Sequence, residues 1–496
     1  MVKEIGIKRT ILGPDGSIQS YEHAENRMSE AIEKAVFRQS IFGKYSLLDD
    51  AYRGSGGFET GNYLIPHTAE SAEKYARRKQ MSYYINFIKP IIDSHVNPIF
   101  KSEPVRDGMS EIFELFTKNV DGNNTTLTRF MKKAAIRAKL HGVEFIVIDS
   151  PKINDDTVLT KKRVMEERIY PYLYLVSPSQ VTDWSTDKFG RLISISYSID
   201  NKTVDEEGKV KTVAETWTWT DSICKKSIGD DEEIFPNPIG KIPVVPLYGV
   251  INATDDLIPQ SDLYGVARSS LALYNCLSEL RCKNNAQAFS VLIYPIGDED
   301  DYDNPEQDPI KIGVSDTLLY RNGQQAPKFI SPSSDPNDML MQEANLIIKE
   351  IFRQANLSFM NQQNISNVSG IAKKWDNLQL FRTILELAEN LQTVEDKLAI
   401  LFGLYVNEDL SSYTVTYNKE YGVVDVTETL ANSLTAFGMN ISEGLNYETK
   451  KKVIRAMTDD SDTSVTDRLL AELDKSPEKG AQLDVSNVSS IQPTGA

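Results

Sequence analysis

The densest group of potentially reactive side chains is an acidic run at residues 298–308 (DEDDYDNPEQD), where seven of eleven residues carry a carboxylate and none is basic. Clustered carboxylates can hold a hard cation such as Ca²⁺, and they attract basic partners. Nothing in the sequence forces these side chains to converge, so a solvated loop at a protruding tip is the simpler interpretation. The residues that could bind a cation or a basic partner are Asp298, Glu299, Asp300, Asp301 and Asp303.

The usual signatures of catalysis are absent from the sequence. The four histidines are scattered without an HExxH spacing, and neither Gly43-Lys44 nor Gly240-Lys241 has the flanking residues of a phosphate-binding loop. No GxSxG elbow is present. The three cysteines, Cys224, Cys276 and Cys282, contain no CxxC pair that could hold zinc. We therefore expect no catalytic residue, no metal site and no cofactor, and a protein that is not an enzyme.

Composition narrows the class of protein. The 496 residues include 71 acidic and 54 basic side chains, and the net charge of −17 argues against a protein whose main task is to grip phosphates. Three cysteines fit a reducing cytosol, and neither a signal peptide nor a stretch long enough to span a membrane is visible. The length predicts about three domains or one elongated one.

The first half of the chain combines helices with strands. Helical spacing of apolar and aromatic residues extends over residues 70–100 and again over 127–141, where Lys132, Lys133 and Lys139 are expected on the solvated face. Residues 170–250 are rich in β-branched and aromatic residues, which is typical of strands. Two charged stretches, 200–211 and 225–233, are expected to be hairpin tips. Together these patterns predict an α+β protein.

The second half contains three long helical patterns. Apolar stripes recur at helical spacing over residues 261–283, 335–355 and 371–402. An irregular stretch separates the first two helices, and the uncharged, amide-rich residues 356–370 (NLSFMNQQNISNVSG) separate the second from the third. Such helices are long for the core of one monomer, so we expect their apolar faces to need neighbouring subunits.

The order of these landmarks resembles the portal proteins of tailed bacteriophages, over about residues 60–475. Residues 75–101 resemble the Tyr- and Arg-rich opening of the portal wing, and residues 237–249 (NPIGKIPVVPLYG) resemble the segment that leads into the stem. The most specific matches are Ser261-Asp262-Leu263, with Tyr274-Asn275 further on, and the sequence SGIAKK at residues 369–374. Each motif is weak alone, but the ordered set is strong.

The resemblance implies an elongated portal-type fold with an α/β wing, paired stem helices, a small β-containing clip and a helical crown. The chain would then divide as follows: wing, 1–255; first stem helix, 256–285; clip, 286–333; second stem helix, 334–355; tunnel loop, 356–370; long helix and remaining wing, 371–425; crown, 426–475; disordered tail, 476–496.

The resemblance also implies a function. Portals form a ring, usually of twelve subunits, at one capsid vertex, through which double-stranded DNA is packaged and later ejected. The implied partners are further copies of the chain, non-specifically bound DNA, the major capsid and scaffolding proteins, the large terminase subunit and a head-completion adaptor. The ring would be assembled in the host bacterial cytoplasm and remain in the virion.

An uncharged loop suits a channel that must guide a duplex without gripping it, because amides and hydroxyls attract phosphates less than cations do. We expect the duplex to be faced by Gln362, Gln363, Asn364 and Asn367. A solvated turn between helices is the plainer alternative for this loop. Lys373 and Lys374 could contact phosphate or pair with an adjacent subunit.

Two other functions compete with the portal interpretation. A nuclease or terminase subunit would need a phosphate-binding loop or converging carboxylates, and neither is visible. Another structural protein of the phage head would lack the two stem-like helices that flank an insert. Rotational symmetry of the assembled protein would decide between a portal and another structural protein of the head.

Overall fold

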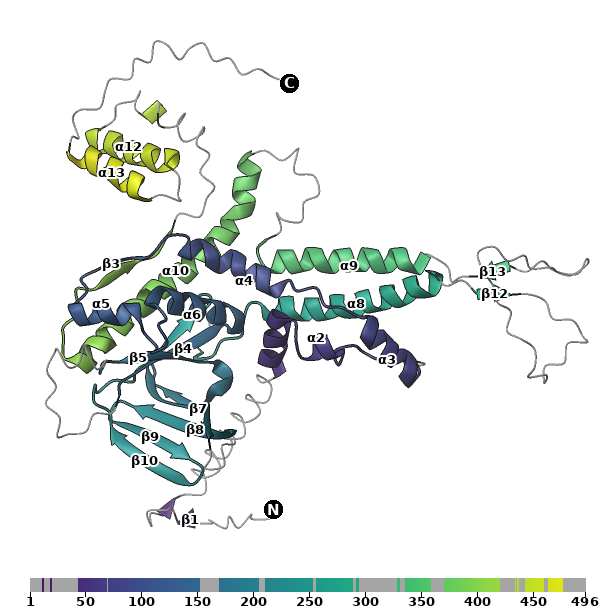
Figure 1. Ribbon diagram of the computed structural model, residues 1–496, viewed down its shortest axis with the longest axis horizontal. Helices are drawn as coiled ribbons and strands as arrows, with labels where there is room; N and C mark the ends of the chain where they lie inside the picture. The colour runs from purple at the N-terminus through teal and green to yellow at the C-terminus, as the bar shows by residue number, and fades with distance from the viewer. Residues whose placement is uncertain are drawn as a thin grey trace, which may run out of the picture. The chain divides into compact units, whose positions relative to one another are not determined.

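The computed structural model describes both helices and strands, in agreement with the predicted mixture (Figure 1). The chain divides into two compact units, Met1–Lys419 and Glu420–Ala496. The described residues are 11–12, 18–19, 43–68, 70–151, 169–204, 210–252, 256–288, 291–293, 328–330, 335–357, 370–419, 433, 435–436, 442–458 and 463–475.

A three-stranded antiparallel sheet in the order β11-β4-β5 lies at the centre of the first unit. Its strands are Val244–Tyr248, Val143–Asp149 and Tyr172–Val176. Strand β4 is buried along its first six residues, and the apolar run at residues 145–148 within it is typical of a buried strand. Helices α6 (Leu127–His141) and α10 (Gly370–Val406) both pack on this sheet.

Local sequence explains both ends of α6. The side-chain oxygen of Thr126 accepts a hydrogen bond from the Arg129 amide and thereby caps the first turn. Gly142 ends the helix with a φ of 92°, which side-chain-bearing residues rarely adopt. A Cβ on Gly142 would also lie 2.9 Å from the Pro259 carbonyl oxygen. The glycine therefore allows the segment before α8 to cross closely over the end of α6.

A five-stranded antiparallel meander, ordered β10-β9-β8-β7-β6, forms the second sheet. Its strands are, in chain order, Val181–Thr186, Leu192–Val204, Val210–Thr220, Ile223–Ile228 and Asp231–Pro236.

Both predicted hairpins are present in this sheet, but their tips are shorter than the stretches 200–211 and 225–233. Strands β7 and β8 stay paired out to Val204 and Val210, and β9 pairs with β10 from Ile223 to Pro236, around a turn at Gly229. Charged residues continue these ladders because antiparallel strands can place them on a solvated face, where oppositely charged side chains meet across strands.

Two long helices pack side by side, antiparallel, in the first unit (Figure 1). Helix α8 covers Tyr264–Ala288 and α9 covers Asp335–Gln354. At one end Gln354 Nε2 donates to Ser269 Oγ, and at the other Asn337 donates to both Asn284 and Gln287. Beyond the helices, the short strands β12 (Val291–Ile293) and β13 (Lys328–Ile330) pair with each other.

Most of the predicted apolar stripe of α8 is buried within the same chain. Leu263, Val266, Ser270 and Leu273 are each no more than 1% exposed. The expectation that this face needs neighbouring subunits is therefore wrong, because α9, α3 and the segment around Phe58 already cover the helix. Exposed apolar side chains occur on α9 instead.

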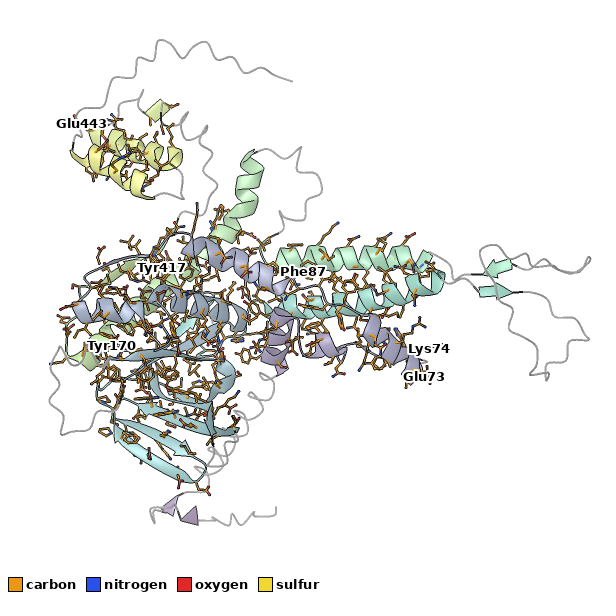
Figure 2. All side chains as sticks on the ribbon, in the orientation of Figure 1. Glu73, Lys74, Phe87, Tyr170, Tyr417 and Glu443 are labelled. Carbon is orange, nitrogen blue, oxygen red and sulfur yellow. The ribbon has the colours of Figure 1, made fainter. Side chains whose placement is uncertain are left out.

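Residues 70–100, expected to be helical throughout, form two helices with an extended link between them. Helix α3 (Ala72–Met81) ends before residues 82–87, and α4 (Ile88–Val96) follows. Phe87 in this link packs edge-on against Phe352 of α9, with ring centroids 5.9 Å apart (Figure 2). The link therefore joins α3 and α4 while anchoring both near the helix pair.

Helix α10 carries the last part of the first unit. Its buried positions include Ile384, Ala388, Leu391 and Leu398, which recur at helical spacing. Strand β14 (Thr414–Thr416) then returns antiparallel to β3 (Val105–Asp107). The smaller elements of the unit are β1 (Ile11–Leu12), β2 (Ile18–Gln19), α2 (Gly57–Thr60), η1 (Asn97–Phe100), α5 (Glu111–Lys118) and η2 (Pro178–Gln180).

The second unit contains helices α12 (Glu443–Met457) and α13 (Thr463–Lys475), which contact each other. Ser442 caps α12 by accepting a hydrogen bond from the Leu445 amide. These helices lie within residues 426–475, for which a helical crown is predicted.

Candidate functional site

Most of the residues predicted to act in the channel lie outside the described part of the chain. This holds for the loop residues Gln362, Gln363, Asn364 and Asn367, and for the acidic residues of the run at 298–308. Lys373 and Lys374 fall in the first turns of α10, where only the backbone is described. The roles of all these residues stay predictions, and the described site is the helix pair that flanks them in sequence.

A buried arginine fixes α3 against α8. Arg78 is 2% exposed, and its guanidinium donates to both carboxylate oxygens of Glu70, at 2.9 and 2.7 Å. A third hydrogen bond reaches the Ile65 carbonyl at 2.7 Å, and the Arg78 carbonyl and Ser278 hydroxyl both bind Ser82 Oγ. The hydrogen bonds from Arg78 lower the pKa of Glu70 to about 2.

A second group of buried charges lies where α8 begins. Lys139 of α6 is fully buried and pairs with Asp262 at 2.5 Å. The helical spacing had placed Lys139 on the solvated face of α6, which is wrong because the chain entering α8 crosses over the last turn. Nearby His95 is buried, and this burial lowers the pKa of its imidazole to about 4.

His141 joins three elements at the same end of α6. Its Nε2 lies 3.1 Å from Asp49, in the helix over residues 43–53, and its Nδ1 lies 3.4 Å from Glu144 of β4. Burial opposes the charged imidazolium, but the hydrogen bonds to both carboxylates outweigh it, so the pKa of His141 is raised. Glu144 is completely buried and also faces Arg137 Nε at 2.9 Å.

These ionic groups were missed at the sequence level, although one signal was available. Glu144 stands inside an otherwise apolar strand sequence, VEFIVID, and a carboxylate at such a position needs a buried partner. The partner of Lys139 comes from 123 residues further along the chain, and no local pattern identifies it, whereas the ionic partner of Arg78 is Glu70, only eight residues before it.

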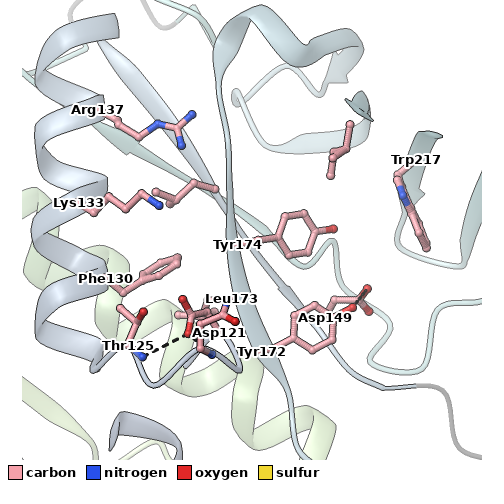
Figure 3. Close-up of a pocket in the computed structure, with 13 residues that line it drawn as sticks. Asp121, Thr125, Phe130, Lys133, Arg137, Asp149, Tyr172, Leu173, Tyr174 and Trp217 are labelled. Atoms are coloured by element: carbon pink, nitrogen blue, oxygen red, sulfur yellow. Dashed lines mark hydrogen bonds between the residues drawn. The ribbon is translucent and has the colours of Figure 1, made fainter. Parts of the chain in front are cut away.

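A pocket of about 550 Å³ opens between α6, the turn at residues 121–125 and the strands β5, β7 and β8 (Figure 3). Its wall combines aromatic, cationic and acidic side chains. They include Tyr172 and Tyr174 of β5, Trp217 of β8, Lys133 and Arg137 of α6, and the carboxylates Asp121 and Asp149.

Most of the polar groups in this pocket bind each other. Asp121 accepts hydrogen bonds from the amides of Asn123 and Thr125, and the Tyr172 hydroxyl donates to Asp149 at 3.1 Å. Burial raises the pKa of Tyr172, so this hydroxyl stays protonated. On the wall of the pocket, the Tyr172 hydroxyl is thus held as a hydrogen-bond donor to Asp149.

Within the described part of the chain, no three His, Cys, Asp or Glu side chains are grouped so that they could hold a metal ion. None of the described helices combines the length and apolar character that a bilayer crossing requires.

Comparison with known proteins gives structural neighbours only. No protein-family model matches the chain, and no curated protein sequence matches it. A chain in the virion of a native gene transfer agent particle is similar over 73% of this chain and 93% of its own length, at 12% identity and a TM-score of 0.41. A chain in the neck of an empty gene transfer agent particle, computed with C6 symmetry, is similar over 72% of this chain and 85% of its own length, at 11% identity and a TM-score of 0.41.

Both of these structural neighbours are components of gene transfer agent particles, one of them of the neck. At this identity and TM-score, the likeness assigns neither a family nor an activity to the chain.

Proposed function

We propose that this chain is the subunit of a portal ring, a non-enzymatic channel through which double-stranded DNA enters and leaves a phage-like capsid. The observation that carries the proposal is the match between motif order and helix order. The Ser261-Asp262-Leu263 motif stands directly before α8, α9 returns antiparallel to it, and the SGIAKK motif at residues 369–374 opens α10.

The arrangement of the first unit supports this role. The segment that enters α8 is joined to the mixed helix-and-sheet base by the ion pair between the buried Lys139 and the partly exposed Asp262, 2.5 Å apart. This contact anchors one end of the paired helices at the base. In the proposed ring, α8 and α9 form the stem and the base forms the wing.

The negative net charge of the chain favours a channel that lets DNA pass over a protein that binds DNA tightly. Each copy carries a net charge of −17, so a ring of identical copies is strongly negative. A negative lining repels phosphates and shortens the contacts that cationic side chains would otherwise make. In this proposal the loop at residues 356–370 meets the duplex with uncharged amides, and Lys373 and Lys374 bind either phosphate or the adjacent copy.

The proposed partners follow from the same role. The segment between the stem helices, with its acidic run, serves as the clip that receives the large terminase subunit and later a head-completion adaptor. The outer parts of the ring contact major capsid and scaffolding proteins.

Native mass spectrometry and negative-stain imaging of the purified full chain test the proposal. We expect a closed ring with a central channel and a mass that is a whole multiple of 55.7 kDa, with twelve copies as the first expectation. Neither ATP hydrolysis nor metal-dependent DNA cleavage is expected from the purified chain. A stable monomer at high concentration, or unaided cleavage of nucleotide or phosphodiester bonds, would refute the proposal.

A further inference from the structure

The two edges of the five-stranded sheet differ in regularity. Strand β6 forms one edge, and its pairing with β7 is interrupted twice, between Val181 and Asp183 and between Ser185 and Thr186. Such irregularities twist a strand and hinder further pairing. Strand β10 forms the other edge and lies outermost in the sheet (Figure 1). It pairs with β9 over all six of its residues without a shift in register, so its edge is the one suited to accept another strand.

The outer side of β10 carries backbone groups that no described strand binds. In an antiparallel pair, residues bonded to the neighbouring strand alternate with residues whose amide and carbonyl point the other way. The Asn237 amide donates to the Ser222 carbonyl at 2.9 Å, which fixes the phase of this alternation. Glu232 and Ile234 therefore direct their N–H and C=O groups away from β9. Pro236, the next residue of this set, has no amide hydrogen and ends the edge.

The end of the β9–β10 hairpin has a surplus of negative charge. Residues 230–233 are four consecutive carboxylates, and the only cations of β9 are two lysines. Both lysines are already paired within the chain, Lys225 with Glu232 at 2.5 Å and Lys226 with Glu215 at 3.2 Å. The two exposed aspartates that begin the acidic run have no ion pair with another described residue. A cationic partner would therefore meet carboxylates that are not yet neutralised.

The side chains of β10 restrict which strand can pair with it. Ile234 is 62% exposed and offers an apolar contact to the residue directly opposite. Asp231 and Glu233 point to the other face of the sheet, so the neighbours of that opposite residue meet carboxylates. Like charges placed opposite each other destabilise pairing, which disfavours the same edge of a second copy. The matching strand alternates basic side chains with aliphatic ones.

We propose that the outer edge of β10 binds an extended segment of a partner protein, in which lysine or arginine alternates with aliphatic residues, as a sixth strand of the sheet. Backbone hydrogen bonds to Glu232 and Ile234 supply the affinity, and the carboxylates select basic side chains. This site is independent of the proposed portal function, because it uses neither the helix pair nor the loop at residues 356–370.

The test titrates the purified full chain with a short, end-capped peptide in which lysine alternates with valine, and follows binding by fluorescence anisotropy at low salt. Hydrogen–deuterium exchange should locate the peptide by slower exchange at Glu232 and Ile234, whose amides face outward. Two control peptides separate the contributions. Replacing lysine by glutamate reverses the charge, and methylating the valine amides removes the donors that would bond to β10. We expect neither control peptide to bind.

Two pairs of variants test the same contacts from the side of the chain. Ile234→Pro removes one outward amide without using a bond to β9, whereas Ile234→Thr keeps that amide. We expect the proline variant to bind the lysine peptide roughly tenfold more weakly and the threonine variant to bind nearly as well as the unaltered chain. Asp231→Lys should also weaken binding, whereas Asp200→Lys, at an exposed position on β7, is the charge-matched control and should not.

The outcomes are separable. Absence of binding to the unaltered chain overturns the proposal, as does equal binding of the lysine and glutamate peptides. Binding that survives both Ile234→Pro and methylation of the peptide shows adsorption by charge alone and overturns it too. If Ile234→Pro loses the far-ultraviolet circular dichroism of the unaltered chain, the methylated peptide decides, because it removes hydrogen bonds to the same edge from the side of the partner.

Discussion

Replacing Arg106 by methionine should open the sheet formed by β3 and β14. Arg106 lies on β3, is 9% exposed at its side chain, and donates from Nε to Glu395 Oε1 at 2.6 Å and from Nη2 to Oε2 at 3.3 Å. Glu395, on α10, is completely buried and also accepts hydrogen bonds from the hydroxyls of Tyr413 and Tyr417. One carboxylate therefore ties together β3, α10 and the segment that contains β14.

The loss of stability depends on the charge of Glu395, which remains buried after Arg106 is replaced. Removing one partner of a buried ion pair costs about 3–5 kcal/mol, because the remaining charge is left without compensation. The hydroxyls of Tyr413 and Tyr417 still solvate Glu395, so we expect the lower end of that range, about 3 kcal/mol. Since about 1.4 kcal/mol is a tenfold change, amide exchange that requires β3 and β14 to separate should accelerate roughly 100-fold.

Hydrogen–deuterium exchange followed by mass spectrometry measures this opening directly. The matched control is Arg353→Met, which removes a similar bidentate pair with Glu350 at an exposed position and should leave exchange rates nearly unchanged. Adding Glu395→Gln to Arg106→Met removes the uncompensated charge and should restore much of the protection. If Arg106→Met changed exchange no more than Arg353→Met, the buried carboxylate would not be what holds this sheet together.

Three further outcomes can be measured. The carboxylate partners of His141 raise its pKa in the folded protein, so its protonated form stabilises the fold. This stability is fully present below about pH 6.5 and is lost as the pH rises through the pKa of His141 in the folded protein. The Tm should therefore fall on the alkaline side of that pKa. His141→Gln should flatten this dependence, and an unchanged slope would contradict it. Gly249→Ala should lower the Tm by several degrees because its Cβ would lie 2.3 Å from the Ala138 carbonyl oxygen, whereas Gly444→Ala, with open space around it, should not. Deleting residues 359–367 should leave ring assembly intact and impair DNA packaging, and normal packaging would remove that loop from the mechanism.

Local patterns predicted the long elements well. The helices α6, α8, α9 and α10 were expected from apolar spacing, because periodicity depends only on residues a few positions apart. The bounds of α6 and α9 agree with the expected ones to within one residue, whereas α8 starts at Tyr264 and reaches Ala288 and α10 extends to Val406, several residues beyond the expected ends. Element type was thus more predictable than element boundary.

What the sequence could not give were the partners of buried charges. Arg106 and Glu395 are 289 residues apart, and Lys139 was assigned to solvent because its partner Asp262 lies 123 residues further along the chain, in the segment before α8. For the same reason the burial of α8 was expected to come from other copies, whereas α9 and α3 of the same chain supply it. The candidate site residues at 298–303 and 362–367 stay predictions, since they lie outside the described part of the chain.

The way in which the helix hairpin is closed has a consequence for how such a chain can diversify. The segment between α8 and α9 leaves and returns through paired strands, with Val291 opposite Ile330, and the Asn337 amide ties the first turn of α9 to Asn284 and Gln287. Doubling the length of a loop whose ends are already held costs only about 0.6 kcal/mol. The stretch in between can therefore be lengthened, shortened or exchanged for another sequence during evolution while α8 and α9 keep their register.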